Sequence, residues 1–249
     1  MPSFFHFLIL GIVQGVCEFL PISSTGHLVL YRHIFGVRVE TPILGDVLLH
    51  LGTVLSIIVF LQPKKIIDDL TSNYRGLIIS FIFTIPTALI FERVAEIAND
   101  NIYLLSFLFV FGGSILLGSK VKKNLIQNNF IRYAFIGVLQ GIAALPGVSR
   151  SGSTISGALI MGFSPDYAFR FSFLLSIPTI LSAAFYEILK HYHNLYFGWG
   201  MLFGMFLSFI FGVISLYILK KVVISLKLHL FGFYMFAVGF ITFLYFILR

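Results

Sequence analysis

Apolar residues in this chain fall into runs that are too long and too numerous for a water-soluble fold. A helix needs about 20 mostly apolar residues to cross the hydrocarbon core of a bilayer, and six runs approach or reach that length. We expect membrane spans at Ile43–Leu61, Leu77–Phe91, Ile102–Leu117, Phe169–Ile188, Phe197–Leu219 and Leu228–Leu248. The pattern predicts an all-α, polytopic membrane protein with about six transmembrane helices.

Two further apolar segments are shorter and end in residues that break helices. Phe4–Leu20 runs into Pro21–His27, and Ile131–Leu145 runs into Pro146–Gly152. Interrupted backbone at membrane depth has to be buried in protein or line a wet cavity, because lipid offers no hydrogen bonds. We therefore expect two re-entrant helical elements.

These two elements also resemble each other in sequence. Gly11–Val16 (GIVQGV) matches Gly137–Ile142 (GVLQGI) at an offset of 126 residues. Three expected spans lie between them, and an odd number of crossings turns the second copy upside down. We expect one membrane domain, 1–249, built from two inverted halves, 1–125 and 126–249.

Basic residues give the orientation. If each re-entrant element returns to its own side, eleven Lys and Arg residues share one face of the membrane. Five lie on the other face, and Arg150 lies at the second re-entrant tip. The positive-inside rule assigns the face with eleven to the cytoplasm, so both termini and the first re-entrant element face outward.

Composition narrows the class of protein further. The chain has 249 residues, of which 58% are hydrophobic and 11% are charged. Soluble domains carry about 25% charged residues, so most of this surface must face lipid. The net charge of +7 comes from scattered loop residues rather than a basic stripe, which argues against nucleic-acid binding. Cys17 is the single cysteine, so the chain has no intramolecular disulfide and no cysteine-based metal cluster.

Polar residues that do not belong in hydrocarbon gather at the two breaks. Gln14 and Glu18 are four residues apart, which places both on one face of a helix. A charged side chain at mid-membrane costs about 2.5 to 3.5 kcal/mol on insertion scales, so Glu18 and Arg150 call for partners or water. If the two halves are inverted, Glu18 and Arg150 would be partners for each other.

The residues that follow each break favour anion binding. Ser23, Ser24 and Thr25 are candidate N-caps for a helix whose first turn contains His27. Ser149–Gly152 repeats this plan and adds the guanidinium of Arg150, whose geometry matches phosphate oxygens. Free amides at two helix N-termini, with Arg, His and hydroxyl groups, predict a phosphate-binding cradle.

Structural roles compete with this interpretation. Small residues at a break also let helices pack closely. His27 could be a hydrogen-bonded bundle residue, and Glu18 with Arg150 could form a structural ion pair. Asp46 and His50, four residues apart on the next span, could support the site or take part in it.

The two motifs, Gln14–His27 and Pro146–Gly152, resemble those of undecaprenyl-diphosphatases, the bacitracin-resistance phosphatase family, and the resemblance covers essentially the whole chain. It implies an integral membrane enzyme of the bacterial inner membrane, with a site open to the outer face. Such an enzyme removes the terminal phosphate of a polyprenyl diphosphate lipid, which regenerates the carrier for peptidoglycan synthesis and confers bacitracin resistance. Membrane lipid is the expected surrounding, and a homodimer is compatible with this reading.

The resemblance also implies roles for individual residues. The catalytic set is Glu18, Ser24, His27 and Arg150, and the substrate-binding set is Gln14, Ser23, Thr25, Gly26, Ser149, Ser151 and Gly152. The family uses a divalent cation, Mg²⁺ or Ca²⁺, which would be held here by Glu18 and Gln14. Many members carry Glu where this chain has Gln14, so this chain has one carboxylate fewer.

We hypothesise that Ser24 attacks the terminal phosphorus with His27 as general base, while Arg150 and the helix N-termini stabilise the transferring phosphoryl group. Attack by water or by His27 is the alternative chemistry. A transporter or flippase of a lipid phosphate or organic anion is the alternative function, because inverted repeats with broken helices are typical of secondary transporters.

Overall fold

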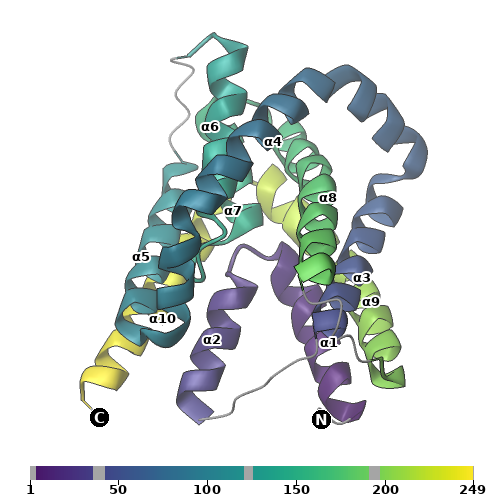
Figure 1. Ribbon diagram of the computed structural model, residues 1–249. Coiled ribbons are helices and arrows are strands. Elements are labelled where there is room, and N and C mark those ends of the chain that lie inside the picture. Colours follow the sequence, from purple (N-terminus) through teal and green to yellow (C-terminus); the bar gives the residue numbers. More distant parts are fainter. Residues whose placement is uncertain (1–3, 36–42, 121–125, 191–196, 249) are drawn as a thin grey trace. The chain divides into compact units, whose positions relative to one another are not determined.

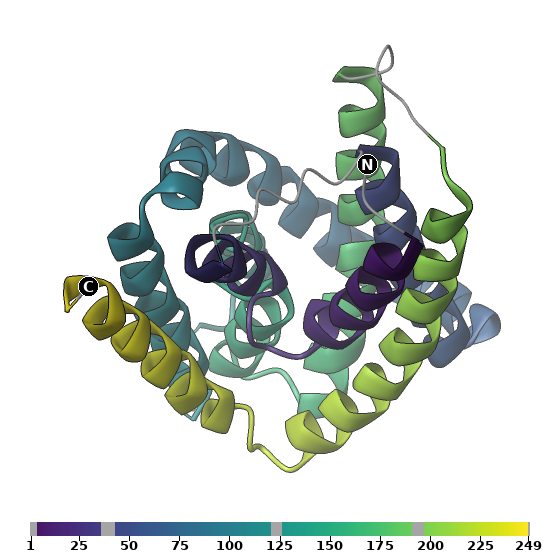
Figure 2. The same ribbon diagram turned by 90° about the horizontal axis from the view of Figure 1, so that it is seen from below.

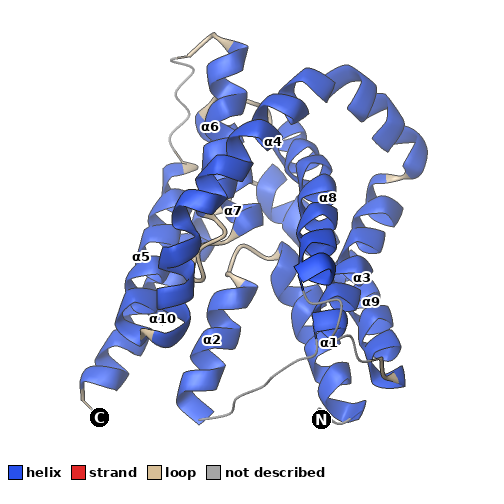
Figure 3. Cartoon of the chain, in the orientation of Figure 1, coloured by secondary structure: helices blue, strands red, loops and turns tan. Residues whose placement is uncertain are grey.

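The computed structural model describes residues 4–35, 43–120, 126–190 and 197–248. In these ranges every regular element is a helix and none is a strand (Figure 3). Four of the basic residues counted for the orientation, Arg38, Lys122, Lys123 and Arg249, lie outside the described residues.

The described part of the chain contains ten helices, which are labelled in Figure 1. They are α1 (Phe4–Phe19), α2 (Ser24–Phe35), α3 (Ile43–Leu61), α4 (Pro63–Asp100), α5 (Ile102–Gly118), α6 (Asn129–Ile142), α7 (Arg150–Ile160), α8 (Pro165–Lys190), α9 (Trp199–Ile224) and α10 (His229–Ile247). Each of the six expected spans falls on one of these helices.

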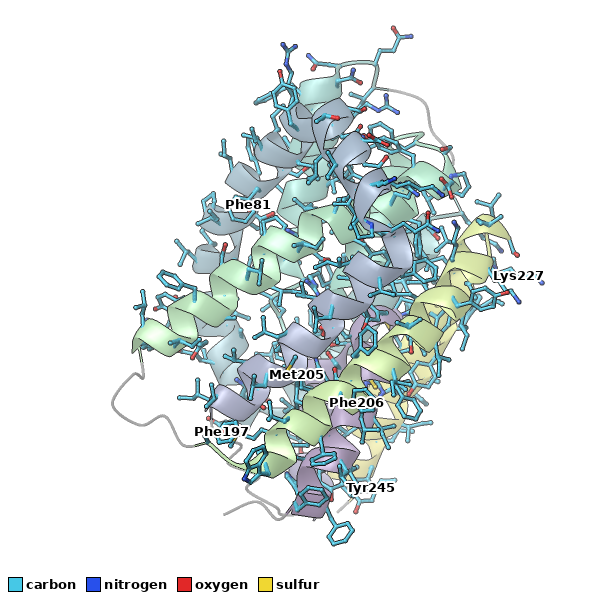
Figure 4. All side chains as sticks on the ribbon, turned by 90° about the vertical axis from the view of Figure 1, so that its right-hand side faces the viewer. Phe81, Phe197, Met205, Phe206, Lys227 and Tyr245 are labelled. Carbon is cyan, nitrogen blue, oxygen red and sulfur yellow. The ribbon has the colours of Figure 1, made fainter. Side chains whose placement is uncertain are left out.

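Five of the described helices, α3, α4, α8, α9 and α10, are long and apolar enough to cross a membrane. The sixth expected span is α5, an apolar helix of 17 residues. The chain is therefore an all-α, polytopic membrane protein. Large apolar side chains on the outside of the helices agree with this class: Phe206 is 58% exposed and Tyr245 is 45% exposed (Figure 4).

Contacts divide the chain into two compact units. The first unit combines Met1–Leu20, Arg38–Ser72 and Phe173–Leu219, and the second combines Pro21–Val37, Asn73–Ser172 and Lys220–Arg249. Each unit draws on segments from both halves of the sequence. The division into inverted halves, 1–125 and 126–249, stays a prediction.

In the first unit, α1 packs closely against α9. Gly11 faces the backbone of Gly204, and a Cβ atom on Gly15 would lie 2.6 Å from the carbonyl oxygen of Ser208. The hydroxyl of Ser208 in turn donates to the carbonyl of Leu49 on α3, at 2.8 Å. Three helices are thereby joined through small residues, as is usual in membrane bundles.

The second unit contains the same type of packing between α6 and α4. Gly137, the repeat equivalent of Gly11, faces the backbone of Ser80. The hydroxyl of Ser80 donates to the carbonyl of Tyr133 at 2.8 Å. The repeated Gly-x-x-x-Gly segment of the sequence thus serves, in each unit, as the surface on which a long helix packs.

Helices α5 and α10 lie side by side in the second unit (Figures 1 and 2). A Cβ atom on Gly113 would lie 2.8 Å from the carbonyl oxygen of Gly232, and one on Gly239 would lie 2.6 Å from that of Ser106. These two contacts show that the helices run antiparallel. The 126-residue offset of the repeat converts each of these contacts into the other, because Gly113 corresponds to Gly239 and Ser106 corresponds to Gly232. Such a crossing is what inverted halves would produce.

Candidate active site

The first break in the chain is organised by Ser23. This residue precedes α2, has a φ of 65°, and its hydroxyl accepts a hydrogen bond from the backbone N–H of Gly26 at 3.3 Å. Ser23 is therefore the N-cap of α2 among the three candidates that the sequence offered. Ser24 and Thr25 occupy the first turn of the helix, where the backbone N–H groups have no partner within the helix.

The second break has a matching cap. Ser149 precedes α7, and its hydroxyl accepts from the backbone N–H of Gly152 at 3.2 Å. Ser149 and Gly152 stand 126 residues after Ser23 and Gly26, so the repeat seen in the sequence extends to the cap geometry. Arg150 is the first residue of α7.

The two breaks meet within the second unit. The backbone N–H of Gly147 donates to the hydroxyl of Ser23 at 2.9 Å, and a Cβ atom on Gly26 would lie 2.6 Å from the same nitrogen. Gly147 has a φ of +89°, which favours glycine. Ser23 thus caps its own helix and holds the turn that leads to Arg150.

Phe109 of helix α5 contacts residues of both breaks. The aromatic ring of Phe109, which is fully buried, would lie 2.8 Å from a Cβ atom on Gly26. The backbone nitrogen of Phe109 would lie 2.9 Å from a Cβ atom on Gly147. The same ring contacts the imidazole of His27 edge to face, with 5.2 Å between ring centroids.

His27 is held at both ring nitrogens. Its Nδ1 bonds to the carbonyl oxygen of Ser23 at 2.9 Å, and its Nε2 bonds to the hydroxyl of Tyr234 on α10 at 2.8 Å. The rings of His27 and Tyr234 are nearly parallel, with an angle of 7° between their planes. The predicted proton transfer from Ser24 to His27 stays a prediction.

The start of α7 is a buried polar segment. Ser149 and Ser151 are each 3% exposed, and their hydroxyls lie 3.3 Å apart. Thr154 donates to the carbonyl of Arg150 at 2.9 Å, one turn along the helix. Five of the predicted substrate-binding residues therefore lie at the two joined breaks: Ser23, Gly26, Ser149, Ser151 and Gly152. Arg150, the first residue of α7, directly follows the second break.

Gln14 and Glu18 belong to the first unit and form their own buried cluster. The amide nitrogen of Gln14 donates to the carboxylate of Glu18 at 3.1 Å and lies 3.0 Å from Nδ1 of His50. Glu18 is 9% exposed, and its carboxylate lies 4.0 Å from the same imidazole nitrogen. Of the pair Asp46 and His50, the structure thus places His50 in contact with the predicted motif.

Sequence patterns did not single out Tyr234 or Phe109. Both lie in apolar spans, where an aromatic residue is usually bulk that faces lipid or neighbouring helices. Tyr234 contacts a residue 207 positions earlier in the chain.

The close contact at Gly26 leads to a stability prediction. We expect Gly26→Ala to destabilise the protein by about 2 kcal/mol, because the added methyl group would overlap the Gly147 backbone and the Phe109 ring. Gly118→Ala is the matched control, since its Cβ atom would meet only the flexible end of Ile160 at 3.3 Å. Thermal unfolding in detergent measures both variants. Equal melting temperatures for the two would contradict this account of the contact.

Comparison with known proteins agrees with the motifs. The family model of the bacitracin resistance protein BacA matches residues 7–241. The chain is 38% identical to an undecaprenyl-diphosphatase of Methanococcus maripaludis, over 95% of this chain and 99% of the relative. It is 38% identical to one of Thermosipho africanus, over 95% and 98%, and 44% identical to one of Carboxydothermus hydrogenoformans, over 74% and 73%. The chain belongs to the family of the bacitracin resistance protein BacA.

Proposed function

We propose that the chain is an undecaprenyl-diphosphate phosphatase, which hydrolyses the terminal phosphate of this lipid to give undecaprenyl phosphate and inorganic phosphate. The relatives bear the name undecaprenyl-diphosphatase. The observation that carries the proposal is the hydrogen bond from Gly147 to Ser23, because it joins the breaks that precede Ser24 and Arg150.

Substrate binding follows from the two capped helices. Backbone N–H groups in the first turns of α2 and α7 favour an anion, and the guanidinium of Arg150 adds two hydrogen bonds of suitable spacing for phosphate oxygens. The polyprenyl tail needs an apolar environment, which the lipid-facing helices offer.

Hydrolysis proceeds in two displacements in this proposal. The Ser24 hydroxyl attacks the terminal phosphorus as its proton passes to His27, and the bond from phosphorus to the bridging oxygen breaks. The electron pair leaves with the lipid monophosphate. Water then attacks the phosphoserine and releases inorganic phosphate. Arg150 and the helix amides stabilise charge on the transferring group throughout.

A divalent cation fits the chemistry of Glu18 and Gln14. Both lie on one face of α1, where the amide nitrogen of Gln14 donates to the carboxylate of Glu18. Glu18 would offer its carboxylate oxygens to the ion, and Gln14 its amide oxygen once the amide group turns over. Mg²⁺ commonly takes one or two carboxylates and completes its shell with water and substrate phosphates. When bound, such an ion would supply positive charge of the kind that stabilises phosphate groups in phosphoryl transfer.

Removal of divalent cations is expected to stop turnover. A chelator should lower phosphate release at least about tenfold, and added Mg²⁺ or Ca²⁺ should restore it. Glu18→Gln should raise the cation concentration needed for half-maximal activity by about 10- to 100-fold. Glu96→Gln, on the exposed surface of α4, is the control and should leave that concentration unchanged. Full activity in the presence of chelator would exclude the cation from the reaction.

We place the enzyme in the inner (plasma) membrane, with the site open to the outer face, on the basis of the basic-residue distribution. There it would recycle the lipid carrier for peptidoglycan synthesis. Resistance to bacitracin would follow, because the diphosphate that the drug binds is removed.

Phosphate release in detergent tests the function. Purified protein should release inorganic phosphate from undecaprenyl diphosphate and yield the monophosphate, whereas a transporter or flippase needs separate compartments and releases none. A mock purification from cells without the protein is the control. Wild-type protein that releases no more phosphate than this control would contradict the proposed function and favour transport.

A further inference from the structure

Hydrogen bonding fixes the tautomer of His27. A carbonyl oxygen can only accept a hydrogen bond, so Nδ1, which lies 2.9 Å from the carbonyl of Ser23, must carry a proton. In the neutral imidazole, Nε2 therefore holds the lone pair. Nε2 is the nitrogen at which His27 would take up a proton during catalysis.

The hydroxyl of Tyr234 forms a hydrogen bond with this nitrogen. Because neutral Nε2 can only accept, the tyrosine hydroxyl donates across the 2.8 Å that separates the two atoms. The imidazole is also held edge-on against the ring of Phe109, with 86° between the planes. The ring is thereby fixed in plane, in tilt and in tautomer by three residues, one from the first break and one from each of two helices.

We propose that Tyr234 is a positioning residue that acts through His27, an inference that rests on the proposed function. Its hydroxyl donates to Nε2 while His27 is neutral. When the nucleophile gives up its proton, the hydroxyl first turns and frees the lone pair of Nε2, which takes that proton. The hydroxyl then accepts a hydrogen bond from the protonated nitrogen. A tyrosine hydroxyl can serve both states because it has one proton and free lone pairs.

The position of Tyr234 suits this role. It lies on α10, and the carbonyl oxygen of Gly232 on this helix is 2.8 Å from where a Cβ atom of Gly113 on α5 would lie. The glycine contact brings α10 close to α5, which carries Phe109. Tyr234 is also 43% exposed, so its hydroxyl lies at an accessible edge of the helix pair.

The kinetics of Tyr234→Phe test the proposal, because this substitution removes the hydroxyl and keeps the aromatic ring. We expect kcat to fall about tenfold, which corresponds to about 1.4 kcal/mol, while KM stays within about twofold. The effect should vanish in a His27→Ala background, because Tyr234 acts through the imidazole. Tyr245→Phe, on the same helix, is the matched control with unchanged kcat. A wild-type kcat in Tyr234→Phe, or an undiminished effect without His27, would overturn the proposal.

Nitrogen chemical shifts of the His27 imidazole test the pairing without turnover. In ¹⁵N-histidine-labelled wild-type protein, Nδ1 should appear protonated and Nε2 unprotonated, with the signals assigned by their loss in His27→Ala. Tyr234→Phe should leave Nδ1 protonated, because the carbonyl of Ser23 still holds it, and should shift the Nε2 signal. If the signals are the same in Tyr234→Phe and in the wild type, the pairing of Tyr234 with His27 is wrong, whatever the activity. If wild-type protein releases no phosphate, the proposed function is wrong, whatever the signals.

Discussion

Replacement of Ser24 by alanine is expected to lower phosphate release by at least about 10³-fold, because the variant lacks the oxygen that attacks phosphorus. KM should change little, since the backbone amides of α2 remain in place. Ser24 is the first residue of α2, so the substitution removes no cap. The measurement is inorganic phosphate release from undecaprenyl diphosphate in detergent.

Ser114→Ala is the matched control for this experiment. Ser114 lies on the exposed side of α5 and bonds only the carbonyl of Val110 in its own helix, so its loss should leave kcat unchanged. Rapid quenching of the wild-type reaction should also trap phosphate on Ser24. A Ser24→Ala variant that keeps more than about a tenth of the wild-type rate would exclude Ser24 as the nucleophile and leave water or His27 in that role.

Substitution of Arg150 by lysine is expected to lower kcat/KM by about 10²-fold, and substitution by alanine by about 10³-fold. Lysine keeps the positive charge but loses the paired N–H groups that match two phosphate oxygens. The difference between the two variants therefore separates charge from geometry.

Arg93→Lys provides the control for Arg150, because Arg93 is exposed on α4 and should tolerate the exchange. Inorganic phosphate as a competitive inhibitor gives a second measurement, and its inhibition constant should rise in both Arg150 variants. Equal activities of Arg150→Lys and the wild type would show that only charge is needed there.

Hydropathy and helix-capping rules predicted much of this protein. All six expected spans coincide with helices because apolar length is a direct consequence of bilayer thickness. The caps at Ser23 and Ser149 were predictable because few side chains can satisfy a free N–H at a helix start. The span at Leu77–Phe91 is only the middle of α4, which continues in both directions through polar residues that hydropathy excludes.

Contacts between distant segments could not be predicted from the sequence. His27 meets Tyr234 across 207 residues, and Gln14 meets His50 across 36. Neither pairing follows from spacing along one helix, because it depends on which helix faces share an interface. A single tyrosine in an apolar span resembles any other membrane aromatic until its neighbours are known.

The glycine crossing of α5 and α10 bears on motion during turnover. Beside the crossing, Phe236 lies 2.8 Å from the Cβ position of Gly113, and Leu117 lies 3.0 Å from that of Gly232. A slide of one helix along the other would bring these bulky groups to the crossing itself, where the two backbones approach through glycine residues that have no side chain. We therefore expect the two helices to keep their register, so that Tyr234 and Phe109 hold their places beside His27 from one catalytic cycle to the next.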